Sequence, residues 1–173
     1  MQISSRAIDS SPVVVSEHQF AGKYLIFYLG KEEFGIEVLK VKEIMGVLDI
    51  TPVPHLPAHI KGVINLRGKI IPVVDLRLKF GMQSVDYTQR TCIIVVNAAV
   101  DGAQTSIGIV VDGVAEVLNI SDGDIENTPK FGDGTDTSYM LAMAKIKGQV
   151  KLLLNIDKAL DTKELSGLTT LTN

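Results

Sequence analysis

The stretch FGIEVLKVKEI at residues 34–44 decides the fold class, because a later stretch repeats its pattern without a gap. That later stretch is IGIVVDGVAEV at residues 107–117. Both begin with alternating apolar residues around a glycine, which is the pattern of a β-strand with one buried face. The aligned pairs are Gly35 with Gly108, Ile36 with Ile109, Val38 with Val111, Val41 with Val114, and Glu43 with Glu116.

A second pair of segments repeats in the same order. LRGKIIPVVDL at 66–76 aligns with IKGQVKLLLNI at 146–156, which places Gly68 on Gly148. It also places Asp75 on Asn155. Two repeats are too few for a solenoid, which needs three or more to bury its core. We therefore expect two similar β units of about five short strands each, and small barrels are the architecture that closes such units.

The apolar runs between turn signals are rich in Val and Ile, which favour strands. Residues 39–45 stay open between helix and strand, and residues 119–138 are typical of a loop. Asp101-Gly102 is expected at a hairpin tip. Pro72 has no N–H to donate, so we expect it on an edge strand or at a bulge. The expected strands are 24–29, 34–38, 63–68, 69–76, 91–96, 106–117 and 147–156.

The domain organisation follows from the repeat and from the polar ends of the chain. Residues 20–160 are expected to form one domain of two pseudo-repeated barrel subdomains, at about 23–80 and 90–156, with a linker at 81–90. Residues 1–19 are expected to be a flexible N-terminal tail, and residues 161–173 a C-terminal tail.

Composition excludes several classes of function. The chain has 173 residues and a net charge of −3, with no Lys/Arg cluster of the kind that binds nucleic acid. No apolar run approaches the roughly 18 residues of a membrane helix, so we expect no direct membrane insertion. Cys92 is the only cysteine, and a lone cysteine in an apolar run indicates a reducing cytoplasm rather than a disulfide framework.

No catalytic or metal-binding pattern is present in the sequence. His18, His55 and His59 lack the further ligands that a zinc site requires, and we interpret His55 and His59 as surface side chains. The glycines at 62 and 68 do not have the spacing of a phosphate-binding loop, and no GxSxG elbow occurs. We therefore expect a non-enzyme without cofactor or metal.

The same segments resemble a known family. IKGVINLRGKIIPVVDLR at 60–77 closely resembles the signature of the CheW family, the coupling proteins of bacterial chemotaxis. EEFGIEVLKVKEI at 32–44 and GIVVDGVAEVL at 108–118 resemble its two other hallmark blocks, and the similarity runs from Lys23 to Leu160. The resemblance implies two intertwined five-stranded SH3-like β-barrels with short connecting helices, packed around a shared hydrophobic centre, and no enzymatic activity.

The resemblance also implies partners. Members of the family bridge the cytoplasmic tip of methyl-accepting chemotaxis receptors to the regulatory domain of the histidine kinase CheA. This chain carries no additional ATP-binding, phosphoacceptor or receiver domain, so the coupling role is expected rather than that of the kinase. The implied location is the cytoplasm, with recruitment to membrane receptor arrays through the partners.

The family's receptor-binding positions are carried over by motif to Val41, Glu43, Gly62, Arg67, Val114 and Val117. Arg67 stands at a glycine-bounded corner, where its planar guanidinium can make paired hydrogen bonds. Lys40, Lys42 and Arg67 are all candidate partners for Glu43. The valines are either core residues or exposed contacts, and the sequence leaves both readings open. A groove between the barrels is the expected site.

Three other functions remain open from the residues alone. One is a sensor with a small molecule held between the subdomains, which would show a closed apolar pocket with a few converging polar groups. Another is a paralogue that serves a receptor–kinase array outside chemotaxis. The third is a competitor that caps CheA without a receptor. An adaptor would instead show an open groove and exposed barrel ends.

Overall fold

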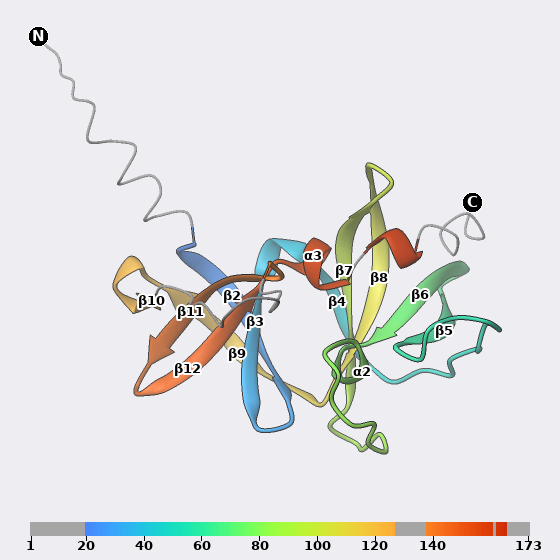
Figure 1. Cartoon of the computed structure of the whole chain (residues 1–173), viewed down its shortest axis with the longest axis horizontal. Helices are drawn as coiled ribbons and strands as arrows, with labels where there is room; N and C mark the ends of the chain where they lie inside the picture. The colour runs from blue at the N-terminus through green and yellow to red at the C-terminus, as the bar shows by residue number, and fades with distance from the viewer. Residues whose placement is uncertain (1–19, 127–137, 161, 166–173) are drawn as a thin grey trace, which may run out of the picture.

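The computed structural model describes residues 20–126, 138–160 and 162–165, which form two sheets that lie side by side (Figure 1). The six-stranded sheet has the order β10-β11-β12-β3-β2-β9, and the five-stranded sheet has the order β4-β7-β8-β6-β5. The strands are β2 Gly22–Leu29, β3 Glu32–Glu37, β4 Val41–Gly46, β5 Ile60–Leu66, β6 Lys69–Asp75, β7 Cys92–Val100, β8 Ala103–Val111, β9 Gly113–Ile120, β10 Ile125–Glu126, β11 Met140–Ile146 and β12 Gln149–Leu154. The short helices are η1 Val38–Lys40, α2 Leu76–Lys79, η2 Asp122–Asp124, α3 Ile156–Leu160 and η3 Thr162–Leu165.

Each sheet contains strands from both halves of the internal repeat. The β2–β3 hairpin pairs with β9 and β12, whereas β4, β5 and β6 join β7 and β8. The expected mainly β fold of two intertwined SH3-like barrels is therefore confirmed, with the two-residue β10 as an additional strand. The sheets do not follow the boundaries 23–80 and 90–156, because the chain crosses between sheets after β3 and again after β8. A repeat identifies equivalent strands but does not determine which strands they pair with.

The registers confirm the internal repeat residue by residue. β3 runs parallel to β12 with Gly35 opposite Leu153, and β8 runs parallel to β6 with Gly108 opposite Val73. The β-bulge that separates Val41 from Glu43 on β4 recurs between Val114 and Glu116 on β9. The two barrels are therefore related by the alignment read from the sequence.

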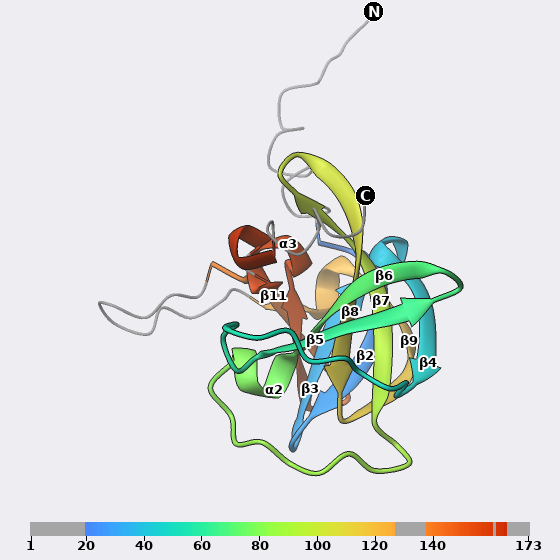
Figure 2. The ribbon, with the colours of Figure 1, turned by 90° about the vertical axis from the view of Figure 1, so that its right-hand side faces the viewer.

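The apolar side chains form three clusters. One fills the six-stranded barrel around Ile26 and Leu153, and another fills the five-stranded barrel around Val73 and Val95. The third and most extensive cluster lies between the barrels and includes Phe27, from the opposite face of β2. Since successive residues of a strand face opposite sides, β2 and its equivalent β7 each supply one barrel interior and the shared centre. Figure 2 views the molecule along its long axis, with β5 and β6 of the five-stranded sheet in front.

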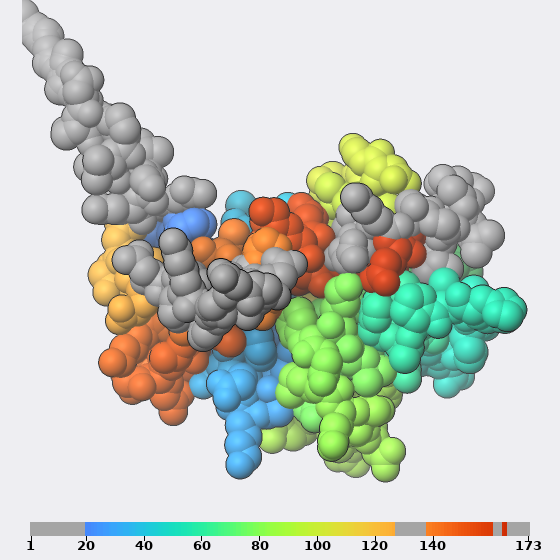
Figure 3. Space-filling model, in the orientation of Figure 1, coloured from blue at the N-terminus to red at the C-terminus, as the bar shows by residue number. Residues whose placement is uncertain are grey.

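Short helices follow equivalent strands of the two barrels, α2 after β6 and α3 after β12. Asp75 accepts a hydrogen bond from the Leu78 amide at the start of α2, and Asn155 accepts one from the Lys158 amide at the start of α3. These are helix-capping contacts, which satisfy otherwise unpaired amides. After α2, the Phe80 ring stacks between the rings of Phe34 and Tyr139. In Figure 3 this green segment fills the surface beside the β2–β3 hairpin.

Several local expectations need correction. Of the open segment 39–45, residues 39 and 40 lie in η1 and the rest lies in strand β4. The expected strand 106–117 is two strands that separate at Asp112. β11 was not expected, because Ile146 is the single β-branched residue in its Ala- and Met-rich sequence. The expected C-terminal tail from 161 is wrong for Leu165, which is fully buried. The N-terminal tail, 1–19, lies outside the described residues.

Pro72 also lies elsewhere than expected, on the internal strand β6. It faces Val63 of β5, and the parallel pairing with β8 begins one residue later, at Val73. Counted from the two-residue turn after Leu66, the Val63–Pro72 pair is a non-hydrogen-bonded pair of the antiparallel ladder. The missing N–H therefore breaks no ladder bond.

A buried ion pair supports one of the two parallel pairings. The Nζ of Lys151 on β12 lies 2.8 Å from Oε2 of Glu33 on β3, and these residues face each other in the register. The ammonium group also donates to Oε1 of Gln149. A buried lysine needs such partners, because its charge is costly to remove from water.

We predict that Gly35→Ala and Gly108→Ala each lower the free energy of unfolding by about 1–3 kcal/mol, the usual cost of overpacking. A Cβ at Gly35 would lie 2.9 Å from Leu153 Cδ2, and one at Gly108 would lie 3.0 Å from Ile93 Cγ2. Urea unfolding measures the change. Gly46→Ala is the matched control, since nothing lies within 4 Å of that position. Equal stability of all three variants would contradict the packing argument.

Candidate functional site

The β5–β6 turn presents Arg67 at one corner of the five-stranded barrel. Arg67 and Gly68 are its two central residues, with φ angles of 52° and 88°, and Leu66 pairs with Lys69. Positive φ at both central positions is the type I′ turn, whose twist suits a two-residue hairpin. The Gly68 amide donates to Asn65 Oδ1 at 2.9 Å, which holds the turn in place.

Arg67 and Glu43 form a paired contact. The Nη1 of Arg67 donates to Oε1 of Glu43 at 3.0 Å, and Nη2 donates to Oε2 at 2.5 Å. Glu43 lies on β4 and Arg67 follows β5, and these strands are the two outer strands of the sheet. The pair, which we name the clasp, therefore joins the edges where the sheet closes into a barrel. Of the three candidate partners for Glu43, the structure selects Arg67.

The clasp is exposed, yet it changes the pKa of both side chains. The hydrogen bonds from Arg67 outweigh slight desolvation and hold the pKa of Glu43 below its usual value. The same contact raises the pKa of Arg67. The side chain of Arg67 is 70% exposed, so its remaining N–H groups are available to another molecule. An exposed pair of this kind contributes little to stability, because water screens it.

The three predicted valines face the side of the barrels that carries the central cluster. Val41 lies opposite Val96 on β7. Val114 and Val117 lie opposite Phe27 and Leu25 on β2. Directly opposed residues of an antiparallel pair share a face, and these three opposed residues belong to the central cluster. Whether a valine is a core residue or an exposed contact differs between these positions. Val41 and Val114 are partly buried, whereas Val117 is 53% exposed.

Ile44 is a further exposed side chain that sequence reasoning missed. It is 44% exposed and lies opposite Ile94 of the central cluster. In the internal repeat it is the equivalent of Val117, and that equivalence was the signal that could have found it. We name Val41, Ile44, Val114 and Val117 the inter-barrel face. Their strands, β4 and β9, are outer strands of their sheets and lie toward the same side of the molecule in Figure 2.

Leu39 was also missed. It is 91% exposed, in η1, where the chain crosses from one sheet to the other just before β4. It borders a cavity of about 300 Å³ that Tyr24 and Glu37 also line. A leucine so exposed at a crossover has no packing role of its own, and exposed apolar groups of this kind often mark interaction sites.

Gly62 differs from the other predicted site residues. It lies on β5 with a φ of 136°, and a Cβ there would lie 2.0 Å from the carbonyl oxygen of Thr51. The backbone of Thr51 pairs with Val63 at this point through two hydrogen bonds. The structure therefore gives Gly62 a packing requirement, and any effect on partner binding would act through the position of β5.

The equivalent corner of the other barrel is different in chemistry. Lys147 and Gly148 form the same turn, with φ angles of 52° and 81°, and Glu116 takes the place of Glu43 on β9. Among the described residues, no ion pair joins Lys147 to Glu116. The clasp is thus a feature of one barrel, because lysine lacks the fork of arginine.

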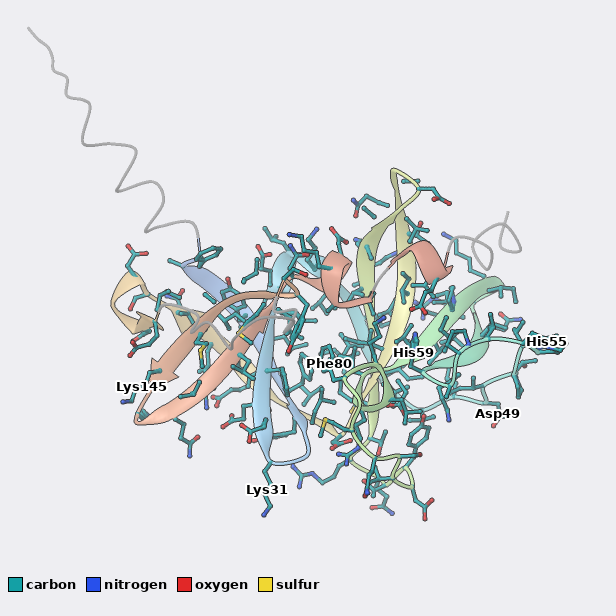
Figure 4. The ribbon with its side chains drawn as sticks, in the orientation of Figure 1. Lys31, Asp49, His55, His59, Phe80 and Lys145 are labelled. Atoms are coloured by element: carbon teal, nitrogen blue, oxygen red, sulfur yellow. The ribbon has the colours of Figure 1, made fainter. Side chains whose placement is uncertain are left out.

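The histidines do not form a metal site in the described part of the chain, where no cluster of three potential ligands occurs. Figure 4 shows His55 at the edge of the molecule and His59 near its centre. The expectation of a surface His59 is wrong, since its ring lies half-buried against Glu164. No helix among residues 20–126, 138–160 and 162–165 is long and apolar enough to cross a membrane.

We predict that Arg67→Ala raises the pKa of Glu43 toward its ordinary value. The hydrogen bonds from Arg67 are the largest cause of the lowered pKa, so their loss should make the carboxylate protonate at a higher pH. NMR titration of the Glu43 side-chain carboxyl carbon measures this. Lys147→Ala is the matched control, because Lys147 has the same turn conformation and should leave Glu43 unaffected. An unshifted Glu43 in Arg67→Ala would mean that the clasp does not form in solution.

The chain is similar to known proteins over most of its length. Residues 23–164 match the family model described as CheW-like domain. The chain is 41% identical over 144 residues to the "Chemotaxis protein CheW" of Klebsiella aerogenes, covering 83% of this chain and 84% of that protein. It is 35% identical over 144 residues to the protein of that name from Rhizobium meliloti, covering 83% and 90%.

A solved structure agrees with the fold. The scaffolding protein TtCheW from Thermoanaerobacter tengcongensis superposes with a TM-score of 0.71 at 32% sequence identity. The match covers 81% of this chain and 92% of that one. With two SH3-like barrels that exchange strands, and with this similarity over most of its length, the chain belongs to the CheW-like domain family.

Proposed function

We propose that this protein is a non-catalytic chemotaxis adaptor that couples chemoreceptors to the histidine kinase CheA. The observation that carries the proposal is the inter-barrel face, where outer strands of both barrels present aliphatic side chains to solvent. The names of the relatives, chemotaxis and scaffolding proteins, support it. Location in the cytoplasm, with recruitment to receptor arrays through partners, belongs to the same proposal.

The receptor tip is proposed to bind at the inter-barrel face. In this family the receptor tip is a helical hairpin, and a helix recognised by a protein surface commonly lays an apolar stripe against aliphatic side chains. Ile44 and Val117 are exposed enough to make that contact, and Leu39 extends it at the crossover. Val41 and Val114 are proposed to contribute through their partly exposed surface.

The clasp is proposed to supply the polar contact with the receptor. Glu43 holds two of the guanidinium's N–H groups, which limits the rotamers of Arg67 before any partner arrives. The remaining N–H groups can donate to an acceptor on the receptor tip. A donor that is already positioned loses less conformational entropy on binding.

The regulatory domain of the kinase is proposed to pack against one barrel end of this protein through apolar side chains. Pro72 does not bear on this choice, because it lies on an internal strand. The outer strands β4, β5, β9 and β10 are the positions at which strand addition would otherwise occur.

A small-molecule sensor is less well supported. The described cavity beside the β2–β3 turn has a volume of about 680 Å³, but it is open and charged side chains line it, among them Arg77, Arg90 and Asp112. The interiors of both barrels are filled by apolar side chains. A closed apolar pocket with a few polar groups, as expected of a sensor, is not among these features.

We predict that Arg67→Ala weakens binding of a receptor cytoplasmic fragment by at least about thirtyfold, as expected of an interface hot spot. Arg67→Lys should also bind substantially more weakly, because a single ammonium cannot hold Glu43 and the receptor at once. Calorimetry measures both. Lys147→Ala controls for the turn conformation. Thermal midpoints should change little, and unchanged receptor affinity in both Arg67 variants would refute the assignment.

We predict that the CheA regulatory domain still binds the Arg67 variants with wild-type affinity, because the proposed kinase contact lies elsewhere. Amide exchange of the wild-type complex locates that contact. Barrel packing should protect scattered amides at one barrel end. Continuous new protection along β4, β5 or β9 would instead indicate strand addition and would contradict the packing proposal.

A further inference from the structure

The last described part of the chain crosses from one barrel to the other. α3 follows β12 of the six-stranded sheet, and η3 comes after it. In Figure 1, α3 lies between β3 and β7, and η3 lies beyond β8. We name α3 and η3 together the strap, because they span the junction between the sheets.

Apolar side chains of the strap enter the central cluster. Ile156, Leu160 and Leu165 are all at most 2% exposed and belong to that cluster. The cluster also includes Val96, Ala98 and Val100 of β7, so the strap covers an apolar strand that would otherwise face water. Burial of these three aliphatic side chains stabilises the seated strap.

Polar contacts fasten the strap at two points. Oδ1 of Asp157 on α3 accepts a hydrogen bond from the Ala99 amide of β7 at 2.9 Å. Oε1 of Glu164 on η3 lies 2.8 Å from Nε2 of His59 and 3.1 Å from Nζ of Lys79. His59 precedes β5 and Lys79 ends α2, so a single carboxylate oxygen ties η3 to two separate segments of the chain.

The Glu164 contact is less exposed than the clasp, in which the side chain of Arg67 is 70% exposed. The side chains of His59, Lys79 and Glu164 are 16%, 17% and 27% exposed. Partial burial acts to raise the pKa of Glu164, but the hydrogen bonds from His59 and Lys79 outweigh it and leave the pKa below its usual value. The carboxylate is therefore ionised at neutral pH, and its contact with the Lys79 ammonium is a partly buried ion pair.

The strap and the inter-barrel face both pack against the central cluster. Val41 and Val114 pack against the same central cluster that Leu165 enters from the strap. Close-packed cores transmit changes of volume, since their side chains interdigitate with few voids. An opening of the strap would remove atoms from the cluster on which both valines rest.

We propose that the strap is a latch between the barrels, locked by Glu164 through His59 and Lys79, and that its opening loosens the inter-barrel face. The latch has two states, η3 seated with Leu165 in the central cluster or η3 released. Its effect on receptor binding rests on the proposed function, whereas its effect on the barrels does not.

Amide exchange of the full chain tests the latch directly. In Glu164→Ala, the strap amides and the Ala99 amide should exchange at least about tenfold faster, as local opening does without global unfolding. Glu164→Gln, which keeps an oxygen acceptor but no charge, should show a smaller change. Glu32→Gln is the matched control, since it removes an exposed carboxylate from β3. Unchanged strap exchange in Glu164→Ala would overturn the proposal, and so would an equal acceleration in β10 and β11.

A double variant separates the lock from simple loss of charge. If His59 acts through Glu164, then His59→Gln combined with Glu164→Ala should exchange no faster in the strap than Glu164→Ala alone. Additive acceleration would overturn the assignment of His59 to the lock. Leu165→Ala, which weakens the seat rather than the lock, should accelerate the same amides.

A receptor arm tests the link to the inter-barrel face. Glu164→Ala should bind a receptor cytoplasmic fragment at least about fivefold more weakly, the lower end of the usual range of coupling between sites. Unchanged affinity with faster strap exchange would refute that link. Failure of the wild-type protein to bind the fragment would count against the proposed function, and the exchange measurements would still decide the latch.

Discussion

Two parallel strand pairs, β3 with β12 and β6 with β8, are the contacts on which the rest of the structure depends. Each unites a strand from one half of the repeat with a strand from the other. Without them, the β2–β3 hairpin would have no neighbour on the β3 side, and β6 would be an edge. Gly35 and Gly108 lie in these pairs because a side chain there would press on the neighbouring strand or hairpin. The shared central cluster follows from these pairs, because each barrel contains strands from both halves of the repeat.

This exchange of strands also explains where the candidate site lies. The crossovers after β3 and after β8 deliver the chain to β4 and β9, which become outer strands of opposite barrels. On each strand the valine just before the bulge, Val41 or Val114, packs against the shared central cluster. The residue after the bulge, Ile44 or Val117, is exposed to solvent. The barrels are alike in backbone but not in hydrogen-bonding geometry, because the forked guanidinium of arginine occupies one corner and the single ammonium of lysine the other. A partner that engages both strands therefore meets an approximately twofold apolar surface with a fork-shaped donor on one side only.

The fold class and most of the candidate site could be predicted from the sequence, whereas the pairing of the strands could not. Repeated glycines and valines identified the equivalent strands, and the clasp was among the pairings considered for Glu43. The pairing partners of the strands could not be predicted, because alternating apolar residues fit either sheet equally well. β11 has only a single β-branched residue, and Leu39 looked like any core leucine until the crossover exposed it. The contact of His59 with Glu164 joins residues 105 positions apart, a separation that no local pattern encodes.

The exchanged strands have a consequence for synthesis on the ribosome. The chain emerges from its N-terminus, so β2 and β3 appear long before β12, which ends at Leu154. The six-stranded barrel cannot close until nearly the whole chain has left the exit tunnel, whereas β4 to β8 complete the other barrel once residue 111 is free. Contacts between distant parts of a chain slow folding, because a long loop must be closed before they form. The nascent protein therefore passes through a stage with one finished barrel and an unpaired apolar hairpin, which is when it most needs protection from aggregation.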